Sequence, residues 1–172
     1  MSRISVMGES LVDVVGETAH PGGSPLNVAV GLARLGHDVQ FYTEFGQDTY
    51  GTQIAEHLDQ AGVHVVEGSV TGRSTSVAQV EMDEHSNAHY TFDIHQQIPA
   101  VPADDSSELL HTGSIAAWIE PSGQGIVDAF QNASENSLRS YDPNLRPDLV
   151  EDRDSALQRI ELLMTLSHVV KL

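Results

Sequence analysis

The stretch Pro21-Gly22-Gly23-Ser24-Pro25-Leu26-Asn27-Val28-Ala29 predicts a turn that is followed by a helix. We expect Ser24 to cap the helix and Pro25 to occupy its first position, where a missing N–H costs nothing. Apolar residues recur at helical spacing until Gly36, which we expect to end the helix. Apolar runs on both sides of this helix are typical of strands, and strand, helix, strand is the unit of a mostly parallel sheet. The runs are residues 4–7, 11–16 and 39–43.

The same alternation continues along the chain and predicts an α/β fold. Asp48 is expected to cap a second helix that ends at Gly62. Residues 74–94 differ, because two alternating β-rich runs flank a polar turn at 83–87, which predicts an antiparallel hairpin inserted into the fold as a flap. The later expected elements are strands at 109–112, 138–141 and 168–172 and helices at 122–133 and after Asp152.

Composition limits the classes of partner. The chain has 172 residues, with 8 Lys and Arg against 25 Asp and Glu, and a formal net charge of −17. This length suffices for one domain with its own core. The acidic excess disfavours nucleic acid and anionic membranes, because both bind through Lys and Arg. The absence of cysteine excludes disulfides, thiolate zinc sites and cysteine nucleophiles. The sequence has neither an apolar stretch of ~20 residues nor the apolar core of a signal peptide, so a cytoplasmic protein is expected.

A carboxylate, two glycines and an amide near the first helix are candidate binding residues. Asp13 lies in a hydrophobic strand, so its carboxylate either faces a site or points to solvent from an edge strand. Gly22 and Gly23 allow a ligand to approach the backbone at the start of the helix. Asn27 offers a donor and an acceptor to the same space, and this combination suits a polyol. The alternative for the glycine stretch is a helix cap without any ligand.

The loop Asp142-Pro143-Asn144-Leu145-Arg146-Pro147 follows an expected strand, where α/β sheets place functional loops. A guanidinium held in such a stiff loop is suited to an oxyanion or phosphate, and the alternative is a proline-rich turn with an Asp cap. The sequence lacks the common phosphate-loop, dinucleotide and nucleophile-elbow motifs. The histidines are scattered, and even for His85, His89 and His95 we expect a surface position and no metal site.

Several of these pieces together resemble the PfkB/ribokinase family of sugar kinases. The family's first signature matches residues 22–29, with Gly36 and Gly46 at the expected later spacings. The resemblance covers essentially the whole chain, and both main motifs look more like those of fructokinases than of ribokinases. The other matching pieces are Gly8-Glu9 with Asp13, Gly46-x-Asp48-x-x-Gly51, Gly62-Val63, Thr75, Asp142-Pro143-Asn144-Leu145-Arg146 and Val169-Val170-Lys171-Leu172.

The resemblance implies a Rossmann-like, mostly parallel sheet flanked by helices, with a small β lid, and transfer of the ATP γ-phosphoryl group to a sugar hydroxyl. It implies ATP and Mg²⁺ as cofactors, is compatible with a monovalent cation, and implies a homodimer through the lid. Arg146 would lie near the sugar or the transferred phosphate, in one loop with Asp142 and Asn144. The residues that the resemblance assigns to sugar hydroxyls are Asp13, Gly22, Gly23 and Asn27.

Two features depart from the family. Its second signature, a Gly-Ala-Gly-Asp-like segment that gives the anion hole and the catalytic base, follows well after the strand that ends here at Leu172, as do the adenine pocket and the cation site. The connection from Val15 to Pro21 is shorter than usual, which predicts a trimmed or absent lid strand. We therefore expect residues 1–172 to be the N-terminal portion of a sugar kinase, inactive alone. A non-catalytic sugar-binding module, a half-protein that needs a second chain and an unstable truncation are the alternatives.

Overall fold

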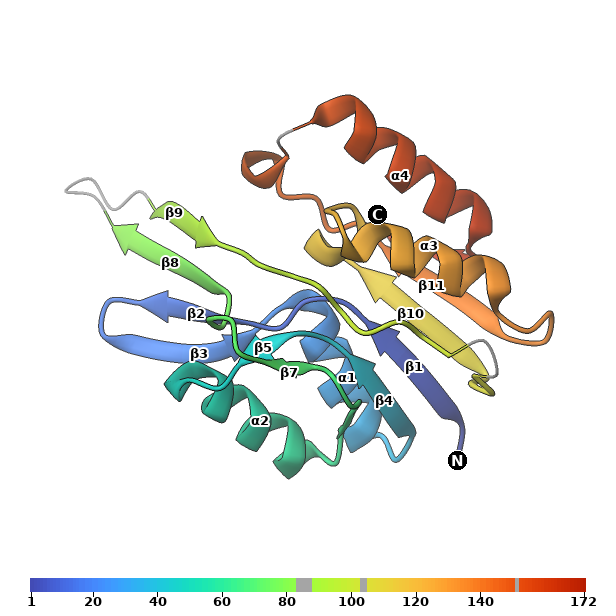
Figure 1. Ribbon diagram of the computed structural model, residues 1–172, viewed down its shortest axis with the longest axis horizontal. Coiled ribbons are helices and arrows are strands. Elements are labelled where there is room, and N and C mark those ends of the chain that lie inside the picture. Colours follow the sequence, from blue (N-terminus) through green and yellow to red (C-terminus); the bar gives the residue numbers. More distant parts are fainter. Residues whose placement is uncertain (83–87, 103–104, 151) are drawn as a thin grey trace.

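A six-stranded sheet forms the centre of the molecule (Figure 1), in a computed structural model that describes residues 1–82, 88–102, 105–150 and 152–172. Its strand order is β12-β11-β10-β1-β4-β6, and every neighbouring pair is parallel. The sequence prediction of a mostly parallel sheet is therefore confirmed. The strands are β1 (Arg3–Met7), β4 (Asp38–Tyr42), β6 (His64–Val65), β10 (Leu109–Gly113), β11 (Leu138–Asp142) and β12 (Val169–Val170).

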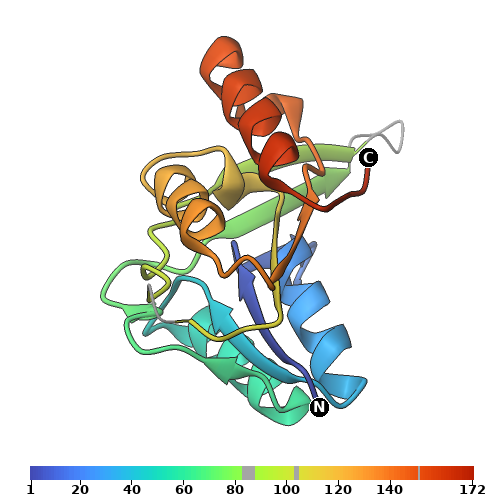
Figure 2. The same cartoon turned by 90° about the vertical axis from the view of Figure 1, so that its right-hand side faces the viewer.

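Helices cover both faces of this sheet (Figures 1 and 2). Because side chains alternate along a strand, Val6 and Phe41 pack in the cluster with α1 and α2, whereas Met7 and Tyr42 belong to the cluster with α3 and α4. None of the helices in the described ranges is long and apolar enough to cross a membrane. The helical elements are α1 (Ser24–Arg34), α2 (Thr49–Ala61), η1 (Ile115–Ala117), α3 (Ser122–Asn132), η2 (Pro147–Leu149) and α4 (Arg153–Leu166).

A second, four-stranded sheet lies beside the central one, with the order β3-β2-β8-β9. The pairs β2–β3 and β8–β9 are antiparallel, and β2 pairs with β8 in parallel. The hairpin predicted within residues 74–94 is present as β8 and β9, although its polar turn at 83–87 lies outside the described residues. The strands of this small sheet are β2 (Leu11–Val15), β3 (Thr18–Gly22), β8 (Val77–Met82) and β9 (Ala88–Asp93). A two-stranded pair, β5 (Phe45–Gly46) and β7 (Val70–Thr71), completes the fold.

The strand β3 corrects two expectations drawn from the sequence. Pro21 and Gly22 were expected in a turn, and the short connection from Val15 was expected to trim a strand of the small sheet or remove it, of which removal is ruled out by the presence of β3. Instead Pro21 pairs with Val12 and Gly22 with Leu11. β3 is an edge strand, so the missing N–H of a proline does not interrupt an inner ladder.

The start of α1 corrects a third expectation. Ser24 is the first residue of the helix and not its cap, and no side chain caps this end. The cap position belongs to Gly23, whose backbone adopts φ 107° and whose carbonyl accepts the amide of Asn27 at 3.0 Å. A positive φ is easily adopted only by glycine. The backbone of Gly23 therefore occupies the cap position, and no capping side chain covers the first turn of α1.

Asp48 joins the start of α2 to the beginning of the small sheet. Its Oδ1 accepts the amide of Gly51 at 2.8 Å and the hydroxyl of Thr75 at 2.7 Å, and Oδ2 accepts the Thr75 amide at 2.8 Å. Although burial opposes the effect, these bonds hold the pKa of Asp48 below its ordinary value. A Cβ on Gly51 would lie 1.9 Å from the carbonyl oxygen of Gly46, so both glycines of the Gly-x-Asp-x-x-Gly motif follow from close packing.

Candidate functional site

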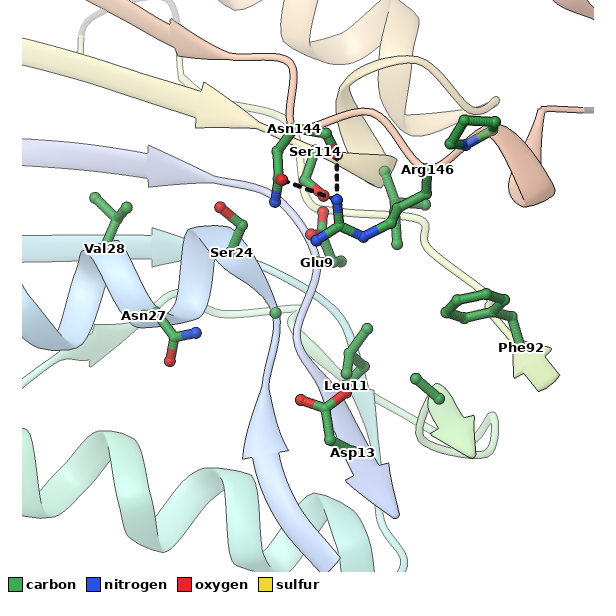
Figure 3. A pocket seen from close by; sticks show the side chains of 14 residues that line it. Glu9, Leu11, Asp13, Ser24, Asn27, Val28, Phe92, Ser114, Asn144 and Arg146 are labelled. Atoms are coloured by element: carbon green, nitrogen blue, oxygen red, sulfur yellow. Dashed lines mark hydrogen bonds between the residues drawn. The ribbon is translucent and has the colours of Figure 1, made fainter. Parts of the chain in front are cut away.

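A cavity of about 740 Å³ lies beyond the carboxyl ends of β1, β10 and β11, between the start of α1 and the small sheet (Figure 3). This is the end of a parallel sheet at which open α/β folds bind ligands. Its wall combines carboxyl, amide, hydroxyl and guanidinium groups with apolar side chains. The lining residues are Glu9, Leu11, Asp13, Gly23, Ser24, Asn27, Val28, Ala78, Phe92, Ser114, Ile115, Asn144, Arg146 and Pro147.

Five of the seven residues expected from the sequence line this cavity, and two do not. Those that line it are Asp13, Gly23, Asn27, Asn144 and Arg146. Gly22 lies against Asp13, because a Cβ on this glycine would come within 2.1 Å of Oδ2 of Asp13. Asp142, at the end of β11, forms an ion pair with Lys171 at 2.7 Å. Gly22 thus leaves space for the carboxylate of Asp13, and the ion pair of Asp142 connects β11 to the segment after β12.

Asp13 projects from β2 and is half-buried. Burial raises the pKa of its carboxyl, and the charges of His20 and Arg146 oppose that rise. His20 is its cross-strand partner on β3, whereas Arg146 reaches the cavity from the loop after β11. The carboxylate of Asp13 therefore lies in the cavity wall with acceptor oxygens for the hydroxyl groups of a ligand.

Arg146 is held by its own loop. Its Nη1 donates to the side-chain oxygen of Asn144 at 2.9 Å, to the carbonyl of Asn144 at 3.2 Å and to the carbonyl of Leu145 at 3.1 Å. Asn144 adopts φ 36°, a conformation that asparagine tolerates better than most residues. One end of the guanidinium is thus fixed to the loop, and the group lines the same cavity as Glu9 and Ser114 (Figure 3).

Glu9 and Ser114 are cavity residues that were not predicted as site residues. Glu9 follows β1, is 1% exposed, and its Oε2 accepts the amide of Ala116 at 3.1 Å. Burial raises the pKa of Glu9 to about 7, although the Ala116 amide and the Ser114 hydroxyl favour its charged form. Ser114 follows β10 with φ 59°, an uncommon backbone conformation for a serine. The available signal was a polar residue just after a buried strand, the same signal that pointed to the loop after β11.

The described part of the chain contains no group of three or more His, Asp or Glu side chains that could hold a metal ion. His95 lies on the surface and pairs with Asp93 at 2.9 Å. His85 lies outside the described residues, as does the side chain of His89.

Comparison with known proteins agrees with this geometry. Residues 3–172 match the model of the pfkB family of carbohydrate kinases. The fructokinase of Salmonella typhimurium is 32% identical over 99% of this chain and 60% of its own length. The structure of the Vibrio cholerae O395 fructokinase in apo form has a TM-score of 0.84 and 27% identity, covering 100% of this chain and 64% of that one. Its form with fructose, ADP and calcium ion gives a TM-score of 0.80 over 99% of this chain and 59% of that one.

Proposed function

We propose that this chain, which belongs to the pfkB family of carbohydrate kinases, forms the sugar-binding part of an ATP-dependent, fructokinase-like enzyme. The observation that supports it most directly is the cavity in which Asp13, Asn27 and Arg146 face one space. A carboxylate accepts hydrogen bonds from hydroxyls, and an amide both donates and accepts. Adjacent hydroxyls of a sugar need this mixture, whereas an apolar ligand does not.

The electrostatic balance of the cavity favours a neutral sugar over a sugar phosphate. Among the described lining residues, two carboxyl groups, those of Glu9 and Asp13, stand against the single guanidinium of Arg146. A phosphate ester would bring close to two negative charges to a wall that is already acidic. Although the N-terminus of α1 can accept an anionic oxygen, proteins usually bind such groups with several Lys or Arg side chains, and Arg146 is the only one among the described lining residues. The substrate class that we propose is therefore a free ketose or a related unphosphorylated sugar.

The small sheet is proposed to close over that sugar. Its strands carry Leu11, Asp13, Ala78 and Phe92 to one wall of the cavity, while the start of α1 and the loop after β11 form the other. Enclosure of this kind removes water from the reacting hydroxyl and strengthens polar contacts. The expected homodimer through this sheet and the expected cytoplasmic location remain predictions.

The chain spans about 60% of the length of the curated relatives that it matches over nearly all of its own length. By the family resemblance, the catalytic base, the nucleotide pocket and the cation sites belong to the part of the relatives' length that this chain does not span. ATP and Mg²⁺ would supply the transferred group and its charge neutralisation. The described residues include no cluster fit for a metal ion, so the proposal assigns to them the binding and orientation of sugar, and no step of phosphoryl transfer.

Calorimetric titration of the 172-residue chain with fructose, ribose and fructose 6-phosphate tests the proposal. Fructose should bind, Asp13→Asn should weaken that binding, and fructose 6-phosphate should bind less well than fructose. No heat with any sugar would refute the sugar platform. Turnover of ATP and fructose by this chain, abolished by Asp13→Ala, would instead show that its residues suffice for transfer. Activity that appears only after addition of a second chain would identify a half-protein.

A further inference from the structure

Glu9 connects two elements that face each other across the cavity. Its side chain follows β1 and accepts the amide of Ala116, in the turn after β10, at 3.1 Å. The amide of Ser24, the first residue of α1, also favours the charged form of this carboxyl. The single side chain therefore lies between the N-terminus of α1 and the N-terminus of η1, as Figure 3 shows from the cavity side. Backbone N–H groups at such ends lack partners within their own helix.

The backbone of Glu9 also touches the start of α1. A Cβ on Gly23 would lie 2.7 Å from the carbonyl oxygen of Glu9 and 3.4 Å from Cα of Ser10. The chain can pass this closely only because position 23 is a glycine. Glu9 thus lies against the start of α1 through its main chain, and its carboxyl group interacts with the amides of both Ser24 and Ala116.

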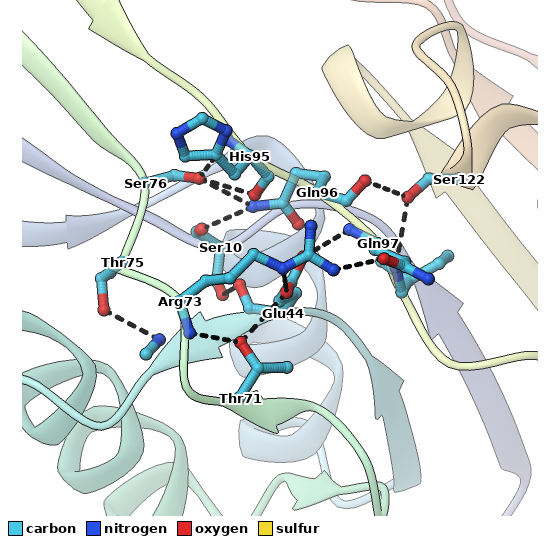
Figure 4. A network of polar contacts seen from close by, with 12 residues as sticks. Ser10, Glu44, Thr71, Arg73, Thr75, Ser76, His95, Gln96, Gln97 and Ser122 are labelled. Atoms are coloured by element: carbon cyan, nitrogen blue, oxygen red, sulfur yellow. Dashed lines mark hydrogen bonds and ion pairs between the residues drawn. The ribbon is translucent and has the colours of Figure 1, made fainter.

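Burial of this carboxyl needs an explanation beyond packing. Glu9 is 1% exposed, and no ion pair with it occurs among the residues that the structure describes. A buried acid without a cationic partner is costly unless hydrogen bonds compensate it, and an apolar residue of similar volume would avoid that cost. Glu44, which is also buried, does have a cationic partner, because Nε of Arg73 lies 3.1 Å from its Oε1 (Figure 4). Glu9 is compensated by amide and hydroxyl groups that belong to the cavity wall itself.

We propose that Glu9 is a positioning residue for sugar binding, whose carboxyl fixes the start of α1 and the Ser114–Ala117 turn at the separation that the sugar requires. Asn27 stands on one of these elements and Ser114 on the other, and both line the cavity. A shift of either element would spoil contacts that need correct distances on both sides of one ligand. The proposal rests on the proposed function, since the ligand whose binding it serves is the sugar of that site.

Two variants and one control test the role in the 172-residue chain. Glu9→Ala removes the carboxyl, and Glu9→Gln keeps an acceptor for the Ala116 amide at nearly the same volume. Glu44→Gln is the matched control, because it changes a buried glutamate outside the cavity. Amide hydrogen exchange at Asn27 and Ala116 reports on the two elements, exchange at Phe41 in β4 reports on global opening, and calorimetry with fructose reports on binding.

Glu9→Ala should speed exchange at Asn27 and Ala116 about tenfold more than at Phe41 and should weaken fructose binding by about tenfold, the effect of one lost charged hydrogen bond. Glu9→Gln should restore the relative exchange rates and the fructose affinity to within about threefold of wild type. Glu44→Gln should change neither the relative exchange rates nor the affinity. Unchanged affinity in Glu9→Ala, exchange that rises equally at all three amides, or a Glu9→Gln variant as impaired as Glu9→Ala would overturn the proposal. If wild type binds no sugar, the proposed function fails, and the positioning role is judged by the exchange data alone.

Discussion

A Cβ atom on Gly22 would lie 2.1 Å from Oδ2 of Asp13 and 3.0 Å from its Cγ, so the carboxylate occupies the space that a glycine leaves free. The two residues stand on neighbouring strands, β3 and β2. The position of the carboxylate in the cavity therefore depends on a residue that does not line it.

Gly22→Ala should weaken fructose binding more than it weakens the fold. The carboxylate of Asp13 is the movable end of a side chain, so it can turn away from the new methyl group, but it then leaves the cavity. We expect a loss of affinity of about tenfold, the size of one charged hydrogen bond. Calorimetry measures it. Gly31→Ala is the control, since a Cβ there meets nothing within 4 Å, and wild-type affinity in Gly22→Ala would show that Asp13 does not bind the sugar.

Thr75→Val should destabilise the fold by about 1–3 kcal/mol, the cost of unpaired buried hydrogen-bonding groups. The hydroxyl of Thr75 donates to Oδ1 of Asp48 at 2.7 Å and accepts the Gly46 amide at 3.0 Å, and valine has nearly the same shape without these bonds. Urea unfolding gives the change in free energy. Thr165→Val on the exposed face of α4 should cost much less, and equal losses for the two variants would contradict the importance of this connection.

The free energy of unfolding should depend on pH through Glu9. Burial raises the pKa of this carboxyl to about 7 from an ordinary value of 4.5, so the folded state binds the proton more tightly than the unfolded state. Its contribution is complete below pH 4.5 and is lost as the pH rises through 7, by about 3 kcal/mol in total. Urea unfolding of wild type and Glu9→Gln between pH 4 and 8 measures this change. Over that range the free energy of unfolding of wild type should fall by about 3 kcal/mol relative to that of the variant.

The difference between the two proteins isolates Glu9 from other titrating groups. Burial also raises the pKa of Asp13, which acts in the same direction, but Asp13 is present in both proteins. The described charged or titratable side chains near this part of the cavity include Asp13, His20, Arg146 and Asp142, and none of them differs between the two proteins. A difference that does not fall with rising pH would show that the Glu9 carboxyl titrates normally.

The sequence pattern was sufficient to predict the central sheet, because the apolar runs that indicate its strands are local features of the sequence. Alternation of short apolar runs with helical periodicity follows from burial on both faces, as Val6 and Met7 show by packing in opposite clusters. The strand at residues 18–22 was missed because Pro21 and Gly22 favour turns locally, and only their place at a sheet edge allows pairing. No local pattern contains that information.

The candidate site was predictable where a residue acts alone and not where it acts through a neighbour. Asp13, Asn27 and Arg146 carry recognisable polar groups beside strands or a helix start, and all three reach the cavity. Glu9 was missed because its role depends on the turn at Ala116, 107 residues away in the sequence. Gly22 supports Asp13 by packing and does not line the cavity itself, which becomes visible only when β2 and β3 are paired.

Two substitutions of Arg146 should distinguish the effect of its charge on the pKa of Asp13 from the effect of its hydrogen bonds within the loop. Its charge lowers the pKa of Asp13 against the larger effect of burial, so Arg146→Ala should raise that pKa further. Arg146→Lys keeps the charge, but its flexible ammonium group lacks the planar, fixed directions of the guanidinium N–H groups that donate to Asn144 and Leu145. The lysine variant should therefore leave the pKa of Asp13 near its wild-type value while the amides of the loop exchange faster.

NMR titration of the Asp13 carboxyl carbon measures the rise in its pKa in Arg146→Ala. Added salt should make that rise smaller, because Arg146 is exposed. An equal pKa of Asp13 in wild type and Arg146→Ala at low salt would mean that the two charges do not interact across the cavity, and that the arginine serves only its own loop.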